Sequence, residues 1–275
     1  MPSESADIHP TEEPLPTLSK LGNPLIPTDL DAEKVATEWL SSFANFAEQG
    51  DVNGILSLIP DSQFSSNIFK ESNDAHDDFA VYWRDMLALT WDFRTFEGTS
   101  KIKQFLVDRL SKPKTVSNIQ LRDASQLQVV KPYPDLAWIQ LSFGFETQFG
   151  LGSGIVRLIP ISTGGTNSNG NDVVWKAHSI FTNLDDLKGF PEKIGALRNA
   201  KPNHGKWEAE REKERSMDKD PTVLIVGGGH SGLGIAARLK VLDIPALVVE
   251  KNERIGDNWR TRYEALCLHD PVCKS

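Results

Sequence analysis

A glycine-rich turn at residues 226–232 constrains the fold of this 275-residue chain more than any other feature. It follows residues 222–226, a short apolar run rich in β-branched side chains that is typical of a buried parallel strand. It precedes residues 231–240, whose pattern predicts a helix. Three positions match the dinucleotide-binding fingerprint: Gly227, Gly229 and Gly232. Glycine there permits a tight turn, close approach of the backbone to a pyrophosphate, and tight packing of helix on strand.

The residues after this helix extend the pattern. A second apolar run at residues 246–249 is followed by Glu250, roughly 20 residues beyond the first glycine, where a ribose-hydroxyl acceptor is expected. The amides and dipole of the helix N-terminus would face the phosphates. Strand, glycines, helix, strand and carboxylate in this order predict a nucleotide-binding βαβ unit. A turn that uses glycine only for tight packing remains the alternative.

The segments at residues 251–260 and 262–272 resemble the flavin-containing monooxygenases, particularly fungal members with an extra N-terminal domain. In that family the first glycine fingerprint binds FAD. The resemblance therefore implies a set of FAD-binding residues: Gly227, Gly228, Gly229, His230, Ser231 and Gly232 at the pyrophosphate, Glu250 at the adenosine ribose, and Asn258 and Trp259 from the following loop. His230 is expected to contribute its backbone alone. The family usually has two glycines before this tryptophan, whereas this chain has Gly256-Asp257-Asn258-Trp259.

Two further family signatures have no counterpart in this chain. They are a second glycine fingerprint, which binds NADPH, and a signature of Phe, Gly and His between the two nucleotide sites. Our hypothesis is a truncated or mis-spliced product, or a fragment, of a longer enzyme. We expect it to bind FAD weakly or not at all and to lack turnover. The downstream genomic sequence or the full transcript would test this.

The resemblance implies an FAD- and NADPH-dependent monooxygenase that oxygenates a small organic substrate through a flavin hydroperoxide. The alternative from another class is a non-catalytic binding or dimerisation module with a vestigial nucleotide-binding segment. An NAD-dependent reductase would use the same glycines, but residues 258–260 and 268–271 speak against it. No catalytic residue is assigned from the sequence.

Composition excludes several other functions. A net charge of −8 and a pI near 5.3 argue against nucleic acid as a partner. The chain shows no signal-peptide pattern and no apolar run long enough for a membrane span, which predicts a cytoplasmic location. Its two cysteines, Cys267 and Cys273, are expected to be reduced, and no Cys/His spacing indicates a metal site.

Upstream of the glycine turn, the pattern predicts an α+β domain. Helices are expected from residue 28 with an apolar face that includes Trp39 and Phe43, and at residues 52–58, 76–87 and 101–110. Strands are expected at residues 90–96, 115–130, 136–149, 154–161 and 172–183, the last four in one antiparallel sheet. This order resembles the SnoaL-like, cone-shaped fold, in which a curved sheet wraps a helix and encloses a pocket.

We therefore expect four parts in the chain. They are an irregular tail at 1–27, a SnoaL-like α+β domain at 28–200, a charged linker helix at 201–220, and an incomplete Rossmann-type FAD-binding domain at 221–275. A homodimer through the SnoaL-like domain is a further expectation. The densest charge, at residues 206–219, predicts a solvated helix rather than a docking surface.

A pocket in the cone domain could in principle use His178, Asp92, Trp175 or Glu146. Strict alternation along the last strand would place Trp175 and His178 on opposite faces, so that both could not enter one pocket. A single strand histidine is more often structural than catalytic. The expected role of these four residues is therefore structural.

Overall fold

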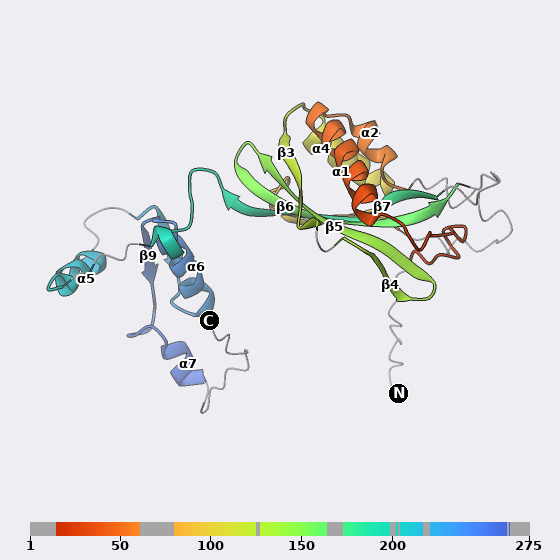
Figure 1. Ribbon diagram of the computed structural model, residues 1–275. Coiled ribbons are helices and arrows are strands. Elements are labelled where there is room, and N and C mark those ends of the chain that lie inside the picture. Colours follow the sequence, from red (N-terminus) through yellow and green to blue (C-terminus); the bar gives the residue numbers. More distant parts are fainter. Residues whose placement is uncertain are drawn as a thin grey trace, which may run out of the picture. The chain divides into compact units, whose positions relative to one another are not determined.

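The computed structural model describes residues 15–60, 80–124, 127–163, 173–198, 202, 204–216, 221–262 and 264. The chain divides into two compact units, Met1–Lys188 and Gly189–Ser275 (Figure 1). This division falls before residue 200, where the first domain was expected to end. No helix in these ranges is long and apolar enough to cross a bilayer.

The first unit is built on a seven-stranded sheet in the order β2-β1-β7-β6-β5-β3, with β4 beside β5. Its strands are β1 Tyr82–Met86, β2 Phe93–Glu97, β3 Val116–Arg122, β4 Val129–Tyr133, β5 Leu136–Thr147, β6 Gly150–Ser162 and β7 Val173–Leu187. Neighbouring strands are antiparallel, except that β1 and β7 are parallel. The predicted α+β class is confirmed, and the sheet contains one parallel pair that was not predicted.

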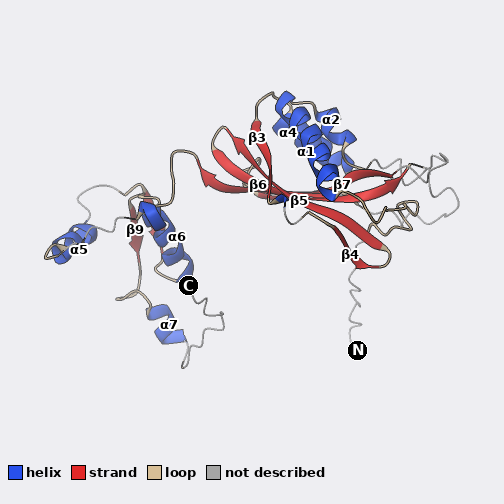
Figure 2. Cartoon of the chain, in the orientation of Figure 1, coloured by secondary structure: helices blue, strands red, loops and turns tan. Residues whose placement is uncertain are grey.

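Three helices cover one face of this sheet: α1 Ala32–Gln49, α2 Val52–Ser57 and α4 Thr99–Leu110 (Figure 2). Helix α1 starts where predicted, because the Asp31 side chain accepts a hydrogen bond of 2.9 Å from the Lys34 amide. It ends at Gly50, whose φ of +73° suits glycine. The expected helices at 52–58 and 101–110 are also confirmed.

The space between the helices and the sheet is filled. Phe43 from α1 stacks on Trp39 with ring centroids 5.4 Å apart and lies edge-on to Phe143 of β5. Trp83 of β1 is completely buried against Phe105 of α4. The void left among these side chains is about 10 Å³, room for about one water. This void is therefore too small for a substrate-sized ligand.

Residues 76–87 were predicted as a helix, and this is wrong for the described residues among them. Residues 82–86 form β1, which pairs with both β2 and β7. Burial alternates along the strand, with Trp83 and Asp85 inside. Tertiary pairing thus overrides the local pattern. Residues 76–79 lie outside the described part of the chain.

Strands β6 and β7 extend beyond the predicted ranges 154–161 and 172–183. Two other strand predictions were wrong for reasons that the structure shows. The strand expected at 90–96 begins only at Phe93, because the turn before it is held by the Asp85 carboxylate, which accepts hydrogen bonds from the Leu89 and Thr90 amides. The strand expected at 115–130 is two strands, β3 and β4. Both pair with β5, and residues 123–128 separate them.

The prediction of strict alternation along β7 is wrong because the strand contains a bulge. Leu158 of β6 pairs with Ala177, whereas the preceding Arg157 pairs with Ser179, which leaves His178 as an extra residue. Ala177 and Ile180 consequently both face the core. Side chains before and after the bulge at His178 therefore face the core at positions that strict alternation would place on opposite faces of the sheet.

The second unit contains the predicted strand-helix-strand arrangement. Strands β8 Val223–Val226 and β9 Ala246–Val249 are parallel, and α6 His230–Val241 connects them. Beyond them lie α7 Asp257–Arg262, and upstream α5 Trp207–Ser216 and a short 3₁₀ turn, Gly195–Leu197. Helix α5 falls within the predicted charged helix. Three segments that the sequence predictions covered lie outside the described ranges. They are residues 1–14 of the expected tail, residues 217–219 of the charged helix, and residues 266–273, which contain both cysteines.

Residues that were expected to end the first domain pack on α6 instead. The Lys193 amide donates to the Val241 carbonyl at 2.8 Å, and the Lys193 ammonium pairs with Asp243. Glu192 pairs with Arg238 at 2.9 Å. These contacts place the stretch from Gly189 onward with the second unit.

Candidate functional site

The glycine turn connects β8 to α6, and two of its glycines are required by the backbone itself. Gly227 has a φ of +104°, and its amide donates to the Val249 carbonyl at 2.7 Å, which ties the turn to β9. A Cβ atom on Gly232 would lie 1.9 Å from the Gly227 carbonyl oxygen. Any side chain at Gly232 would therefore force the helix away from the turn.

The other two glycines face a narrow space. A Cβ atom on Gly228 would lie 3.2 Å from Oε2 of Glu250, and one on Gly229 would lie 3.3 Å from Nδ2 of Asn258. Gly229 is the N-cap of α6 and makes no side-chain cap hydrogen bond. The first amides of α6 are thus served by no capping side chain, which is the arrangement that binds phosphate at helix N-termini.

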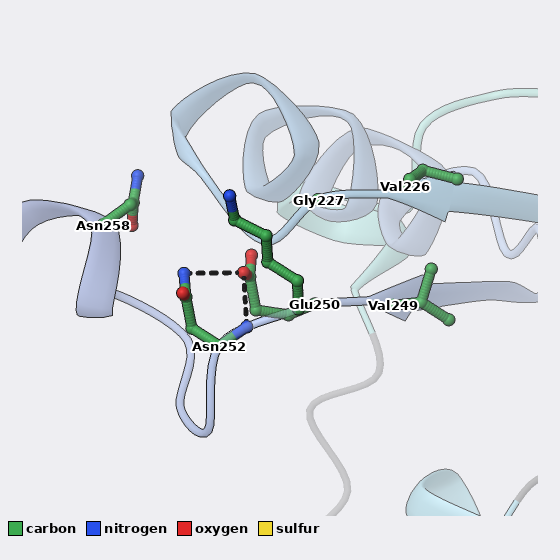
Figure 3. A pocket seen from close by; sticks show the side chains of 7 residues that line it. Val226, Gly227, Val249, Glu250, Asn252 and Asn258 are labelled. Atoms are coloured by element: carbon green, nitrogen blue, oxygen red, sulfur yellow. Dashed lines mark hydrogen bonds between the residues drawn. The ribbon is translucent and has the colours of Figure 1, made fainter.

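Glu250 follows β9 and faces the turn. Its Oε2 accepts from the Gly228 amide at 2.6 Å, and its Oε1 accepts from the Asn252 amide at 3.0 Å and from Asn252 Nδ2 at 2.8 Å (Figure 3). The backbone amides of Asn252 and Gly228 lower the pKa of Glu250 below its usual range. The carboxylate is therefore ionised at neutral pH and held in one orientation.

These groups line a pocket of about 490 Å³, a volume that suits a small-molecule site. Its lining consists of Val226, Gly227, Val249, Glu250, Lys251, Asn252 and Asn258. In Figure 3 Asn258 reaches this space from α7, opposite the two strand ends. Apolar strand ends, one ionised carboxylate and several amides are suited to a nucleoside with hydroxyl donors.

Asp257 fixes the start of α7, which carries Asn258. Its carboxylate accepts from the Arg254 amide at 3.1 Å and from Arg260 Nη1 at 2.8 Å. Both guanidinium groups contribute to a lowered pKa of Asp257, with the Arg260 hydrogen bond as the largest cause. Oδ1 of Asn258 is buried and has no hydrogen-bond partner among the described residues. It is an acceptor available to a ligand.

The structure brings most of the predicted site residues together. Gly227, Gly228, Gly229, Glu250 and Asn258 surround one space. His230 and Ser231 lie in the first turn of α6 with exposed side chains and do not line the pocket. Trp259 does not line it either: its ring lies beside Gly256.

Four of the residues that line the pocket were not among the predicted site residues: Val226, Val249, Lys251 and Asn252. Lys251 and Asn252 follow Glu250 directly, and Asn252 donates two hydrogen bonds to its carboxylate. The sequence signal that could have identified Lys251 and Asn252 is their position directly after Glu250, the predicted ribose acceptor.

The four candidates in the first unit are engaged in separate local contacts. Asp92 pairs with Arg94 at 2.8 Å, and Glu146 pairs with Lys188 at 2.6 Å. The His178 ring lies edge-on to Tyr82, and burial lowers the pKa of His178 to about 4. Trp175 packs against the core. Among the described residues no group of three His, Cys, Asp or Glu could hold a metal ion.

Comparison with known proteins defines the class of this segment. Residues 225–271 match the family described as "NAD(P)-binding Rossmann-like domain". The glycine turn, α6 and the β8–β9 pair thus belong to a Rossmann-like nucleotide-binding segment.

The same region is similar to two curated proteins. It is 42% identical over 59 residues to indole-3-pyruvate monooxygenase YUCCA1 of Oryza sativa subsp. japonica. The aligned stretch covers 21% of this chain and 14% of that protein. It is 43% identical over 49 residues to an uncharacterized CzcO-like oxidoreductase of Geobacillus kaustophilus, which covers 18% of this chain and 14% of that protein. The chain thus matches about one seventh of the length of these relatives.

Among solved structures, the chain is similar to a protein of the NTF2-like family from Streptomyces avermitilis. The likeness covers 56% of this chain and 95% of that one, with 14% identity and a TM-score of 0.35. A score this low does not establish a common fold.

Proposed function

We propose that residues 221–262 bind the adenosine diphosphate half of FAD, as part of an FAD- and NADPH-dependent monooxygenase that acts on a small organic substrate. The observation that carries the proposal is the ionised Glu250 carboxylate beside a glycine cradle in a pocket of about 490 Å³. The relatives that share this segment are a monooxygenase and an oxidoreductase, which supports the reaction class.

The residues present fit the adenosine diphosphate group. A Cβ atom on Gly228 or Gly229 would lie within 3.2–3.3 Å of Glu250 or Asn258, which favours glycine at both positions, and the first amides of α6 would donate to a pyrophosphate. Glu250 would accept from the ribose hydroxyls. Oδ1 of Asn258 is a buried acceptor without a partner among the described residues, and a hydroxyl donor of the ligand would satisfy it.

FAD, when bound, would supply the redox chemistry and the activation of O₂, with NADPH as the reductant. The residues of this chain bind and orient. The strand-helix turn would hold the pyrophosphate and Glu250 would hold the ribose, while Asp257 fixes the start of α7, which carries Asn258. We assign no NADPH-binding residue in this chain.

Equilibrium dialysis of the purified full chain against FAD and against NAD⁺ tests this proposal. We expect weak binding of FAD that ADP displaces, with NAD⁺ bound less tightly. Tighter binding of NAD⁺ than of FAD would instead indicate an NAD-dependent reductase. Binding of neither compound would leave the glycine turn as a packing device.

A second candidate is a non-catalytic dimerisation module in the first unit, which would resemble the SnoaL-like fold. The close packing around Phe43 and Trp83 is compatible with this candidate, since the void there holds only about 10 Å³. Leu151 and Ile155 of β6 and Phe93 of β2 are also 41%, 40% and 61% exposed. A stable dimer by light scattering, dissociated by Ile155→Lys, would support this candidate, and a monomer at all concentrations would refute it.

A further inference from the structure

A second cleft lies in the first unit, between β2 and α4, away from the core. It has a volume of about 370 Å³. Helix α4 contributes one continuous face to it, at three- and four-residue spacing: Lys101, Gln104, Phe105, Asp108 and Arg109. Strand β2 contributes Arg94 and Phe96. The remaining pocket residue, Thr90, belongs to the turn before β2.

The floor of the cleft is aromatic. Phe96 of β2 stacks on Phe105 of α4 with ring centroids 4.3 Å apart and an interplanar angle of 18°. Phe105 is buried, whereas Phe96 is only partly buried and presents an apolar surface to the cleft. A flat apolar group can therefore rest against this floor.

The two ends of the cleft differ in charge. Strand β2 runs into α4 through Gly98 alone, and the two elements are in contact, so the chain reverses there. Lys101 consequently lies near the connection. Arg94 precedes Gly98 by four residues, and Asp108 and Arg109 follow it by ten and eleven, so we infer from chain position that these three side chains lie away from the connection. On this inference, both guanidinium groups belong to the end of the cleft opposite Lys101.

The charged side chains around the cleft have a net positive charge, which suits a ligand with one negative charge. Nε of Arg94 already pairs with Asp92 at 2.8 Å, and Asp108 accepts a hydrogen bond of 2.8 Å from Gln104. Within the described residues, Arg109 and Lys101 have no ion-pair partner. Three cations thus face two carboxylates in a chain whose net charge is −8.

We propose that the cleft between β2 and α4 binds a small aromatic carboxylate, with its ring on Phe96 and its carboxylate at Arg94 and Arg109. The guanidinium groups match the planar carboxylate, and the volume accommodates one or two rings. This site is independent of the glycine turn and of the function proposed for it.

The test uses the full chain and ¹⁹F NMR of 4-fluorobenzoate, with the neutral 4-fluorobenzamide as its matched control. Saturating ADP is present to occupy the glycine-turn pocket. We expect the protein to broaden the benzoate signal and not the amide signal. Arg109→Gln should weaken benzoate binding about tenfold, because it removes a charge-assisted hydrogen bond. Lys103→Gln, on an exposed position of α4 that does not line the cleft, should change nothing.

Three results would overturn the proposal: equal broadening of the amide, equal binding by Arg109→Gln and Lys103→Gln, or no binding of benzoate at millimolar concentration. Competition by inorganic phosphate as effective as that by unlabelled benzoate would refute the role of the aromatic floor. Amide chemical shifts of Arg94 and Arg109 in the wild-type chain locate the bound ligand without any variant, and unmoved shifts would also contradict the proposal.

Discussion

The Glu250 carboxylate accepts a 2.6 Å hydrogen bond from the backbone amide of Gly228, so the end of β9 is joined to the glycine turn by a side chain. The Asn252 amide and side chain hold its other oxygen. The ribose acceptor expected from the sequence is thus oriented before any ligand is present. This preorganisation lowers the ordering cost of binding.

The pH dependence of adenosine binding should reflect the state of Glu250, because adenosine lacks the phosphate that titrates at about pH 6 in ADP. The pKa of Glu250 is lowered by the amides of Asn252 and Gly228, so the carboxylate is still ionised at about pH 5. We expect adenosine affinity to be constant from about pH 8 to about pH 5 and to fall only in more acid solution, as the folded-state carboxylate protonates. Calorimetric titration across this range checks it. A fall in affinity that begins above pH 6, well before the usual range of a carboxyl group, would contradict it.

Gly232 and Gly234 in α6 should respond oppositely to alanine. A Cβ on Gly232 would lie 1.9 Å from a carbonyl oxygen, whereas a Cβ on Gly234 has nothing within 4 Å. Gly232→Ala should destabilise α6 by about 2 kcal/mol through overpacking. Gly234→Ala should stabilise it by about 0.5–1 kcal/mol. Hydrogen exchange of α6 amides measures both, and equal protection in the two variants would count against the close packing of the turn.

His178 should make the first unit sensitive to acid. Burial, the largest cause, and the Arg157 charge together lower the pKa of His178 from 6.5 to about 4. The unfolded chain therefore binds a proton first, and stability falls between pH 6.5 and 4 by roughly 3 kcal/mol. In urea unfolding, His178→Gln should remove this loss, whereas His204→Gln, on an exposed residue, should retain it. Identical pH profiles for the two variants would show that His178 is not responsible.

Asp85 and Asp92 lie in the same turn region but should differ in their contribution to stability. Asp85 is fully buried and accepts from the amides of Leu89 and Thr90 and from the hydroxyls of Thr90 and Thr182. Asp85→Ala strands these donors and should cost about 3 kcal/mol or more. Asp92→Asn, at a solvent-exposed ion pair, should leave the unfolding free energy nearly unchanged. Urea midpoints that shift equally would disprove the distinction.

The fold was predictable where one periodicity governs a whole element. The apolar face of α1 and the strand-helix-strand around Gly227 were both confirmed. The prediction failed where distant pairing decides. Residues 82–86 become a strand because β7 and β2 flank them, and the bulge at His178 follows from the register with β6. Neither cause is visible locally.

In the candidate site, the positions of the glycines and of Glu250 around one turn were predictable because the spacing of strand, turn, helix and strand fixes them. Asn252 was not, because its importance lies in two hydrogen bonds to a neighbour two residues away. Asp257 stands where the resemblance suggested glycine, and it clamps the loop through Arg254 and Arg260. This role of Asp257 could not be predicted from the sequence, because it depends on where the side chains of Arg254 and Arg260 lie.

Calorimetric titration of the full chain with ADP, in the wild type, Glu250→Gln and Glu253→Gln, tests the central claim most directly. Glu253 is an exposed neighbour outside the pocket and serves as the matched control. We predict one ADP site in the wild type, an unchanged affinity in Glu253→Gln, and an affinity about tenfold weaker in Glu250→Gln, because a charged acceptor of ribose hydroxyls is lost. No binding by the wild type, or equal binding by both variants, would contradict the assignment.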